Sequence, residues 1–236
     1  EAAIYALLKE NGFTPDVTAG LSLGEYGALI ASGVMGMRDA FSVVRKRGIY
    51  MQNAVPTGGA MSAVLGLEAA AIEKVCEETQ GMVSIANYNC PGQIVITGEK
   101  TAVDAAGLAL KEAGAKRIIP LNVSGPFHSP MLAHAGEQLG EALREVEIAG
   151  EFLPYVANVT AGYVTEACEV KPLLERQIAS SVRWQQSIER LIADGADTFI
   201  EIGPGKSLSG FMRKINREVS VFNIDKLEDF EKYADR

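Results

Sequence analysis

The sequence is poor in cysteine, with only three among its 236 residues. Cys76, Cys90 and Cys168 are odd in number, widely spaced and free of any Cys-x-x-Cys pair, which argues against a disulfide framework and against a zinc site. We therefore expect reduced thiols, a cytoplasmic setting and no metal centre.

Long apolar runs and positive charge are also scarce. No apolar run reaches the roughly 20 residues that a membrane-spanning helix needs. The formal net charge of −8 argues against a general nucleic-acid-binding role. With 47% hydrophobic and 22% charged residues, the composition is that of a globular protein. We expect neither nucleic acid nor a membrane among its partners.

The most informative motif is GLSLG at residues 20–24, which has the Gly-x-Ser-x-Gly pattern of a nucleophile elbow. A strand-type segment at 16–19 leads into it and a helix-type segment at 25–32 follows. In such a turn the N–H groups of the new helix point at the serine and can stabilise an oxyanion. The alternative is a simple turn in which Ser22 caps the helix and Glu25 completes a capping box. The flanking strand and helix favour the catalytic interpretation.

A serine nucleophile needs a base within hydrogen-bond reach, and the chain has two histidines. His128 lies in a loop after a predicted strand, where α/β folds build their active crevice, whereas His134 falls inside the next predicted helix. The sequence favours His128. Two interpretations of Arg47 remain open. It is part of a solvated basic helix end, or its guanidinium binds a substrate carboxylate, and the sequence spacing does not distinguish between the two. Gln177 is by default exposed, but it could accept a hydrogen bond from His128 Nδ1–H and fix the tautomer.

Periodicity predicts an α/β protein with an inserted unit. The insert, residues 57–123, has the β-α-β-β-α-β order of a ferredoxin-like unit. Its elements are expected at 61–67, 68–80, 83–89, 93–98, 101–114 and 116–123. Asn87 and Asn89 are expected to form a turn at a strand end, with substrate contact as the alternative, and Trp184 is expected in the core.

Outside the insert, alternating helices and strands predict a mostly parallel sheet in a three-layer core. Helices are expected at 1–12, 25–32, 38–53, 130–147, 170–180, 184–193, 207–216 and from 225 onward. Strands are expected at 16–19, 154–159, 197–202 and 219–224.

A set of motifs in fixed order carries a family resemblance that covers nearly the whole chain. The segments are GLSLGEYGALIASGVM, RGIYMQNAVPTGGAMSAVLGL, ANYNCPGQIVITGE, PFHSPML and EIGPGKSLSGFMRKI. Together they resemble the malonyl-CoA:acyl carrier protein transacylases of bacterial type II fatty-acid synthesis. The resemblance implies an α/β-hydrolase-like core at 1–56 and 124–236 and a ferredoxin-like subdomain at 57–123. It also implies ping-pong transfer of a malonyl group from malonyl-CoA to the phosphopantetheine thiol of acyl carrier protein.

The resemblance assigns roles to individual residues. It implies Ser22 as the nucleophile, His128 as general base and then acid, Arg47 as the ligand of the malonyl carboxylate, Gln177 as the residue that orients His128, and the Leu23 N–H as an oxyanion donor. Met51 and Asn89 are further candidates for substrate contact. No cofactor is expected beyond the coenzyme A thioester, which is a substrate.

Two departures from the family pattern bear on these expectations. Leu21 stands where the family usually has histidine, from which we expect tuning and not loss of activity. The family also begins with a strand and a Gly-Gln-Gly segment that supply a sheet strand and a second oxyanion donor. We expect this chain, which starts at Glu1, to lack them. The rival interpretations are a serine hydrolase or thioesterase, an acyltransferase module of a polyketide synthase, and a catalytically weak scaffold that binds the carrier protein.

A cluster of cations near the C-terminus offers a surface for the carrier protein, because carrier proteins of this pathway are acidic as a family. The cluster consists of Lys206, Arg213, Lys214 and Arg217. The alternative is favourable placement of cations at a helix C-terminus.

Overall fold

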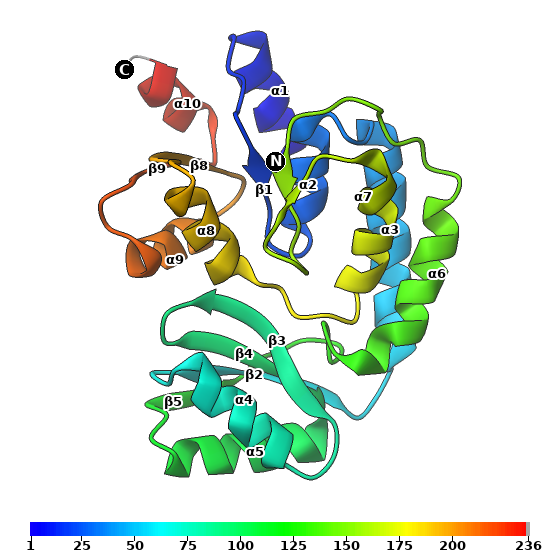
Figure 1. Ribbon diagram of the computed structural model, residues 1–236, viewed down its shortest axis with the longest axis vertical. Helices are drawn as coiled ribbons and strands as arrows, with labels where there is room; N and C mark the ends of the chain where they lie inside the picture. The colour runs from blue at the N-terminus through cyan, green and yellow to red at the C-terminus, as the bar shows by residue number, and fades with distance from the viewer. Residues whose placement is uncertain (235–236) are drawn as a thin grey trace.

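A computed structural model describes residues 1–234 and shows a mixed α/β protein (Figure 1). The helices of this described part are α1 (Ala2–Glu10), α2 (Gly24–Ser32), α3 (Met37–Ala54), α4 (Ala69–Glu78), α5 (Lys100–Glu112), η1 (Pro130–Leu132), α6 (Ala133–Leu143), α7 (Ala167–Gln177), α8 (Trp184–Ala193), α9 (Ser207–Ile215) and α10 (Leu227–Ala234). The strands are β1 (Thr18–Ala19), β2 (Gly59–Leu65), β3 (Val83–Cys90), β4 (Gln93–Glu99), β5 (Arg117–Pro120), β6 (Tyr155–Val156), β7 (Tyr163–Val164), β8 (Thr198–Ile202) and β9 (Ser220–Ile224).

The strands between residues 59 and 120 form one antiparallel sheet with the order β3-β4-β2-β5. Helices α4 and α5 cover one face of this sheet, at the bottom of the view in Figure 1. The buried side chains between sheet and helices include Val64, Ile72, Ile96 and Leu110, each fully enclosed. This apolar core holds α4 and α5 against the sheet.

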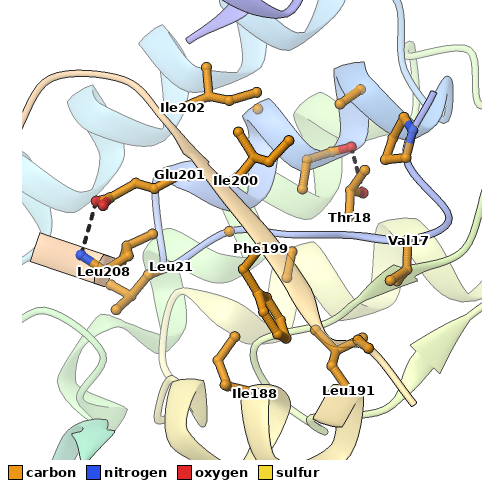
Figure 2. A pocket seen from close by; sticks show the side chains of 18 of the residues that line it. Val17, Thr18, Leu21, Ile188, Leu191, Phe199, Ile200, Glu201, Ile202 and Leu208 are labelled. Carbon is orange, nitrogen blue, oxygen red and sulfur yellow. Dashed lines mark hydrogen bonds between the residues drawn. The ribbon is translucent and has the colours of Figure 1, made fainter. Parts of the chain in front are cut away.

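The remaining strands form two small sheets. In the first, β1 pairs with β6 in parallel and β6 pairs with β7 antiparallel. In the second, β8 and β9 pair in parallel. The sequence analysis expected one core sheet, whereas the structure separates β1 from β8 by a cavity of about 860 Å³. Ile200 and Phe199 of β8 line this cavity, and Figure 2 shows their side chains on opposite sides of the strand, with Leu191 of α8 below.

Helices α2, α3, α6 and α7 enclose the main apolar core, which positions the site at the edge of α2. Its fully buried side chains include Leu29, Leu139 and Leu174. The expected helices are all present, with ends shifted by a few residues. The helix expected at 130–147 divides into a 3-10 turn at Pro130–Leu132 and α6, which ends at Leu143.

Other expectations need correction. The strand expected at 154–159 shortens to Tyr155–Val156, because the chain beyond it turns to meet the elbow, and β7 was not expected at all. Asn87 and Asn89 lie buried within β3 and do not form a turn. Trp184 is buried, as expected, with 4% of its surface exposed. Within residues 1–234, no helix combines the length and the apolar character needed to cross a membrane.

Candidate active site

The turn between β1 and α2 holds Ser22 in a strained conformation. Its φ of 53° is left-handed, a region that serine seldom adopts and that is concentrated at functional sites. Gly20 is required here, since a Cβ at this position would collide with the backbone carbonyl of Gly24. The capping alternative is not found. The residue that precedes the first turn of α2 is Leu23, and its side chain makes no capping bond.

Asn158, which lies far along the chain from this turn, stabilises it with two hydrogen bonds. Its Oδ1 accepts a hydrogen bond from the Ser22 N–H at 2.6 Å, and its Nδ2 donates to the Gly20 carbonyl at 2.6 Å. The side chain is 2% exposed, so both bonds are shielded from water. Asn158 was not among the residues predicted from the sequence. The signal available for it was a polar residue at the end of a buried strand, where α/β folds place their sites.

His128 lies in the loop after β5, and its φ of 60° is also left-handed. Its Nε2 is 2.7 Å from Ser22 Oγ and its Nδ1 is 2.9 Å from the backbone carbonyl of Gln177. A carbonyl only accepts, so Nδ1 carries the proton and Nε2 is free to accept from the Ser22 hydroxyl. The group that orients the histidine is thus the backbone of Gln177 and not its side chain.

Burial governs the protonation of His128. The ring is 4% exposed, and this desolvation, together with the nearby charge of Arg47, lowers its pKa to about 4. His128 is therefore neutral at pH 7, as a proton acceptor must be. His134 lies exposed on α6 and pairs with Glu137 at 3.1 Å, far from this environment.

Arg47 reaches the nucleophile from α3. It is 7% exposed, and its Nη2 donates to Ser22 Oγ at 2.9 Å and to Gln177 Oε1 at 3.1 Å. Its guanidinium also lies 5.8 Å from the centre of the Tyr26 ring, within cation–π range. The interpretation of Arg47 as part of a solvated basic helix end is therefore wrong, because the rest of its helix face packs against α6.

Gln177 is the last residue of α7 and is fully buried. The default expectation of an exposed helix residue is therefore wrong. Its Nε2 donates to the Ser22 carbonyl at 3.0 Å and to Glu25 Oε2 at 2.5 Å, while its Oε1 accepts from Arg47. Glu25 is itself 1% exposed and accepts a second bond from the Asn158 N–H at 3.4 Å. The Gln177 side chain therefore contacts three polar groups around the elbow, namely the Ser22 carbonyl, the Glu25 carboxylate and the Arg47 guanidinium.

The other predicted site residues lie at differing distances from this cluster. Leu23 follows the serine directly and is the residue before α2, at the helix end where backbone N–H groups have no partner within the helix. Met51 is buried one turn beyond Arg47 on α3. Asn89 is buried near the end of β3, and no hydrogen bond links it to Ser22, His128 or Arg47 within the described part of the chain.

Two cavities flank the cluster. A cavity of about 330 Å³ reaches His128 and is lined also by Ser84, Arg176 and Arg183. The larger cavity of Figure 2 lies behind the elbow, where Leu21 forms part of its wall. Among the side chains of residues 1–231, no group of three or more from His, Cys, Asp or Glu is placed to hold a metal ion.

An elbow serine bonded to a buried neutral histidine, with a buried arginine beside it, is the arrangement of proteins that transfer acyl groups through serine. Comparison with known proteins specifies the class further. Residues 1–224 match the acyl transferase domain family, and the chain belongs to that family. It is an acyltransferase.

Individual relatives are similar along almost the whole chain. The malonyl CoA-acyl carrier protein transacylase of Bacillus subtilis is 48% identical over 233 residues, which cover 97% of this chain and 74% of the relative. The structure of MCAT from Streptococcus pneumoniae superimposes with a TM-score of 0.95 at 45% identity, covering 99% of this chain and 77% of that one. A structure described as a type II PKS acyl-carrier protein in complex with its malonyl-transacylase also matches, with a TM-score of 0.95 at 38% identity. The match covers 99% of this chain and 77% of that one.

Proposed function

We propose that this chain transfers a malonyl group from malonyl-CoA to the phosphopantetheine thiol of acyl carrier protein through an acyl-enzyme on Ser22. The observation that carries the proposal is the buried guanidinium of Arg47, 2.9 Å from the nucleophile oxygen. A hydrolase of simple esters has no use for such a cation. An acyl group that ends in a carboxylate does, because a buried cation needs a partner. The names of the relatives support the same substrate and carrier.

In the first half-reaction, Ser22 Oγ attacks the thioester carbonyl while its proton passes to His128 Nε2. The Leu23 N–H donates to the oxyanion that forms on the carbonyl oxygen. The carbon–sulfur bond then breaks, and the departing sulfur of coenzyme A takes the proton from His128. The malonyl group is left as an ester of Ser22.

In the second half-reaction, the thiol of the carrier protein gives its proton to His128, and its sulfur attacks the ester carbonyl. The carbon–oxygen bond breaks, and Ser22 recovers the proton from His128. Arg47 holds the malonyl carboxylate in both halves with two N–H groups, which keeps the ester carbonyl in one orientation. Met51 and Asn89 are proposed as further residues that contact the acyl group. No cofactor takes part besides the thioester substrate.

The architecture that we propose for this function is an α/β-hydrolase-like core, residues 1–56 and 124–236, with a ferredoxin-like subdomain at 57–123. The strand order β3-β4-β2-β5 with two helices on one face supports the second assignment. We also propose a cytoplasmic location, in keeping with three cysteines that are all free thiols.

Intact mass spectrometry tests the proposed function directly. The chain mixed with malonyl-CoA should gain the mass of one malonyl group, should gain far less from acetyl-CoA, and should lose the adduct when holo carrier protein is added. Rapid loss of the adduct in buffer alone would identify a hydrolase instead.

A further inference from the structure

Glu25 is a carboxylate that the fold buries near the site without a cation in contact. It is 1% exposed, and none of the Lys, Arg or His side chains that the structure describes, those of residues 1–231, forms an ion pair with it. Burying an ionisable carboxyl group is costly unless its oxygens are well bonded. Both are bonded here, Oε1 to the Asn158 N–H at 3.4 Å and Oε2 to Gln177 Nε2 at 2.5 Å.

The second of these bonds decides how the carboxamide of Gln177 is oriented. Its nitrogen faces two groups that only accept, the Glu25 carboxylate and the Ser22 carbonyl. Its oxygen faces a group that only donates, the Arg47 guanidinium at 3.1 Å. The opposite orientation would set donor against donor at Arg47. Glu25 supplies the shorter of the two bonds that hold the nitrogen in place.

The orientation of Gln177 in turn places Arg47. The same Nη2 atom donates to Gln177 Oε1 and to Ser22 Oγ, so the position of the guanidinium beside the nucleophile depends on where the amide oxygen lies. We propose that Glu25 is a positioning residue, which fixes the carboxamide of Gln177 and through it places Arg47 to select acyl groups that carry a carboxylate. This inference rests on the proposed malonyl transfer and names a residue beyond those that touch the substrate.

The bonding should respond to pH. Burial raises the pKa of Glu25 to about 7, against the opposing effects of its bonds from Gln177 and Asn158 and of the Arg47 charge. The titratable groups around it are Arg47 from α3, Tyr26 from α2 and Tyr155 from β6. Protonation turns one acceptor oxygen into a donor. Selectivity for malonyl over acetyl should therefore increase as the pH rises through about 7.

Two substitutions separate positioning from mere packing. Glu25→Met keeps the approximate volume but removes both acceptors, whereas Glu25→Gln keeps one. The readout is the rate of Ser22 acylation from malonyl-CoA and from acetyl-CoA, measured by intact mass across pH 6 to 8. The matched control is Glu201→Gln. Glu201 also accepts several bonds, from the N–H groups of Leu208 and Ser209, but contacts neither Gln177 nor Arg47.

Glu25→Met should lower the malonyl-to-acetyl ratio by roughly 10²-fold, the loss typical of a reacting geometry displaced by about 1 Å, and Glu25→Gln by less. Both should lose the pH dependence of the ratio, and Glu201→Gln should keep it. If Glu25→Met does not fold, judged by its melting curve, Glu25→Gln decides the matter through its ratio and pH profile.

A double-mutant cycle with Arg47→Ala completes the test. If Glu25 acts through Arg47, Glu25→Gln should leave the ratio unchanged once Arg47 is gone. An unchanged ratio in both Glu25 variants, or equal losses with and without Arg47, would overturn the positioning role. Failure of the unsubstituted chain to take up malonyl at all would instead overturn the proposed function, so the two failures are distinguishable.

Discussion

Replacing Arg47 by alanine should lower the rate of malonyl transfer much more than the rate of acetyl transfer. The guanidinium is 7% exposed and lies within hydrogen-bond distance of the oxygen that becomes the ester oxygen of the acyl-enzyme. An acyl group on Ser22 therefore begins beside this cation, and a terminal carboxylate can reach it while a methyl group cannot use it.

The size of the effect follows from burial. Removing one partner of a buried charge pair costs about 3–5 kcal/mol, because the other charge is left without solvent or partner. At about 1.4 kcal/mol per factor of ten, the malonyl rate should fall between roughly 10²-fold and several 10³-fold. Arg47→Ala also removes the bond to Gln177 Oε1, but that loss affects both acyl groups. The malonyl-to-acetyl ratio cancels it and isolates the carboxylate contribution.

The assay is the rate of Ser22 acylation from each donor, followed by intact mass under single-turnover conditions. Arg47→Lys should recover little, because one ammonium cannot donate two parallel bonds to a carboxylate. Arg45→Ala, which removes an exposed arginine of the same helix, is the matched control and should leave both rates near normal. Equal losses for malonyl and acetyl in Arg47→Ala would refute the argument and reduce Arg47 to a support of the fold.

Four further outcomes are expected. Ser22→Ala should abolish the malonyl adduct, and His128→Ala should slow acylation by about 10²-fold or more; an adduct that persists in Ser22→Ala would move the nucleophile elsewhere. Because burial and the Arg47 charge lower the pKa of His128 to about 4, acylation from acetyl-CoA, which does not depend on the placement of Arg47 by Glu25 and Gln177, should stay constant down to about pH 5 and fall only below it, whereas a midpoint near 6.5 would contradict this. Charge reversal at the exposed Arg213 and Arg217 should raise KM for acyl carrier protein without changing acylation by malonyl-CoA, and a KM insensitive to both charge and salt would exclude this surface.

The elbow was predictable from sequence because its determinants are local. Two glycines four positions apart, a strand before them and a helix after them are enough to expect a sharp turn at the serine, and in the structure the φ of Ser22 is 53°. The antiparallel unit was equally accessible, since periodicity changes within a continuous stretch of about sixty residues and the boundaries are marked by Pro and Gly. Local rules failed at the ends of elements, as in the helix expected at 130–147, which begins as a 3-10 turn and ends at Leu143.

The residues that surround the elbow were not predictable from local patterns, because they lie far from it in the sequence. Asn158 lies 136 positions from the serine whose N–H it accepts, and Gln177 lies 152 positions from Glu25. Arg47 shows the limit most clearly. Its neighbours Arg45 and Lys46 are exposed, so the composition of the segment is that of a solvated helix end, while Arg47 itself lies on the face that turns inward. Only packing between helices distinguishes the three.

Burial also links the chemistry of the site to its selectivity. It lowers the pKa of His128, raises that of Glu25 and lowers that of Arg47, in each case disfavouring the charged form. The ordinary pKa of histidine is close enough to 7 that burial makes the ring an uncharged base. The ordinary pKa of a guanidinium is so high that the group remains a cation even when burial lowers it. Glu25, with a pKa of about 7, compensates that cation only in part. The exclusion of water that makes His128 a base therefore also leaves Arg47 in need of an anion. An acyl group that ends in a carboxylate supplies this anion at the moment when it reaches Ser22.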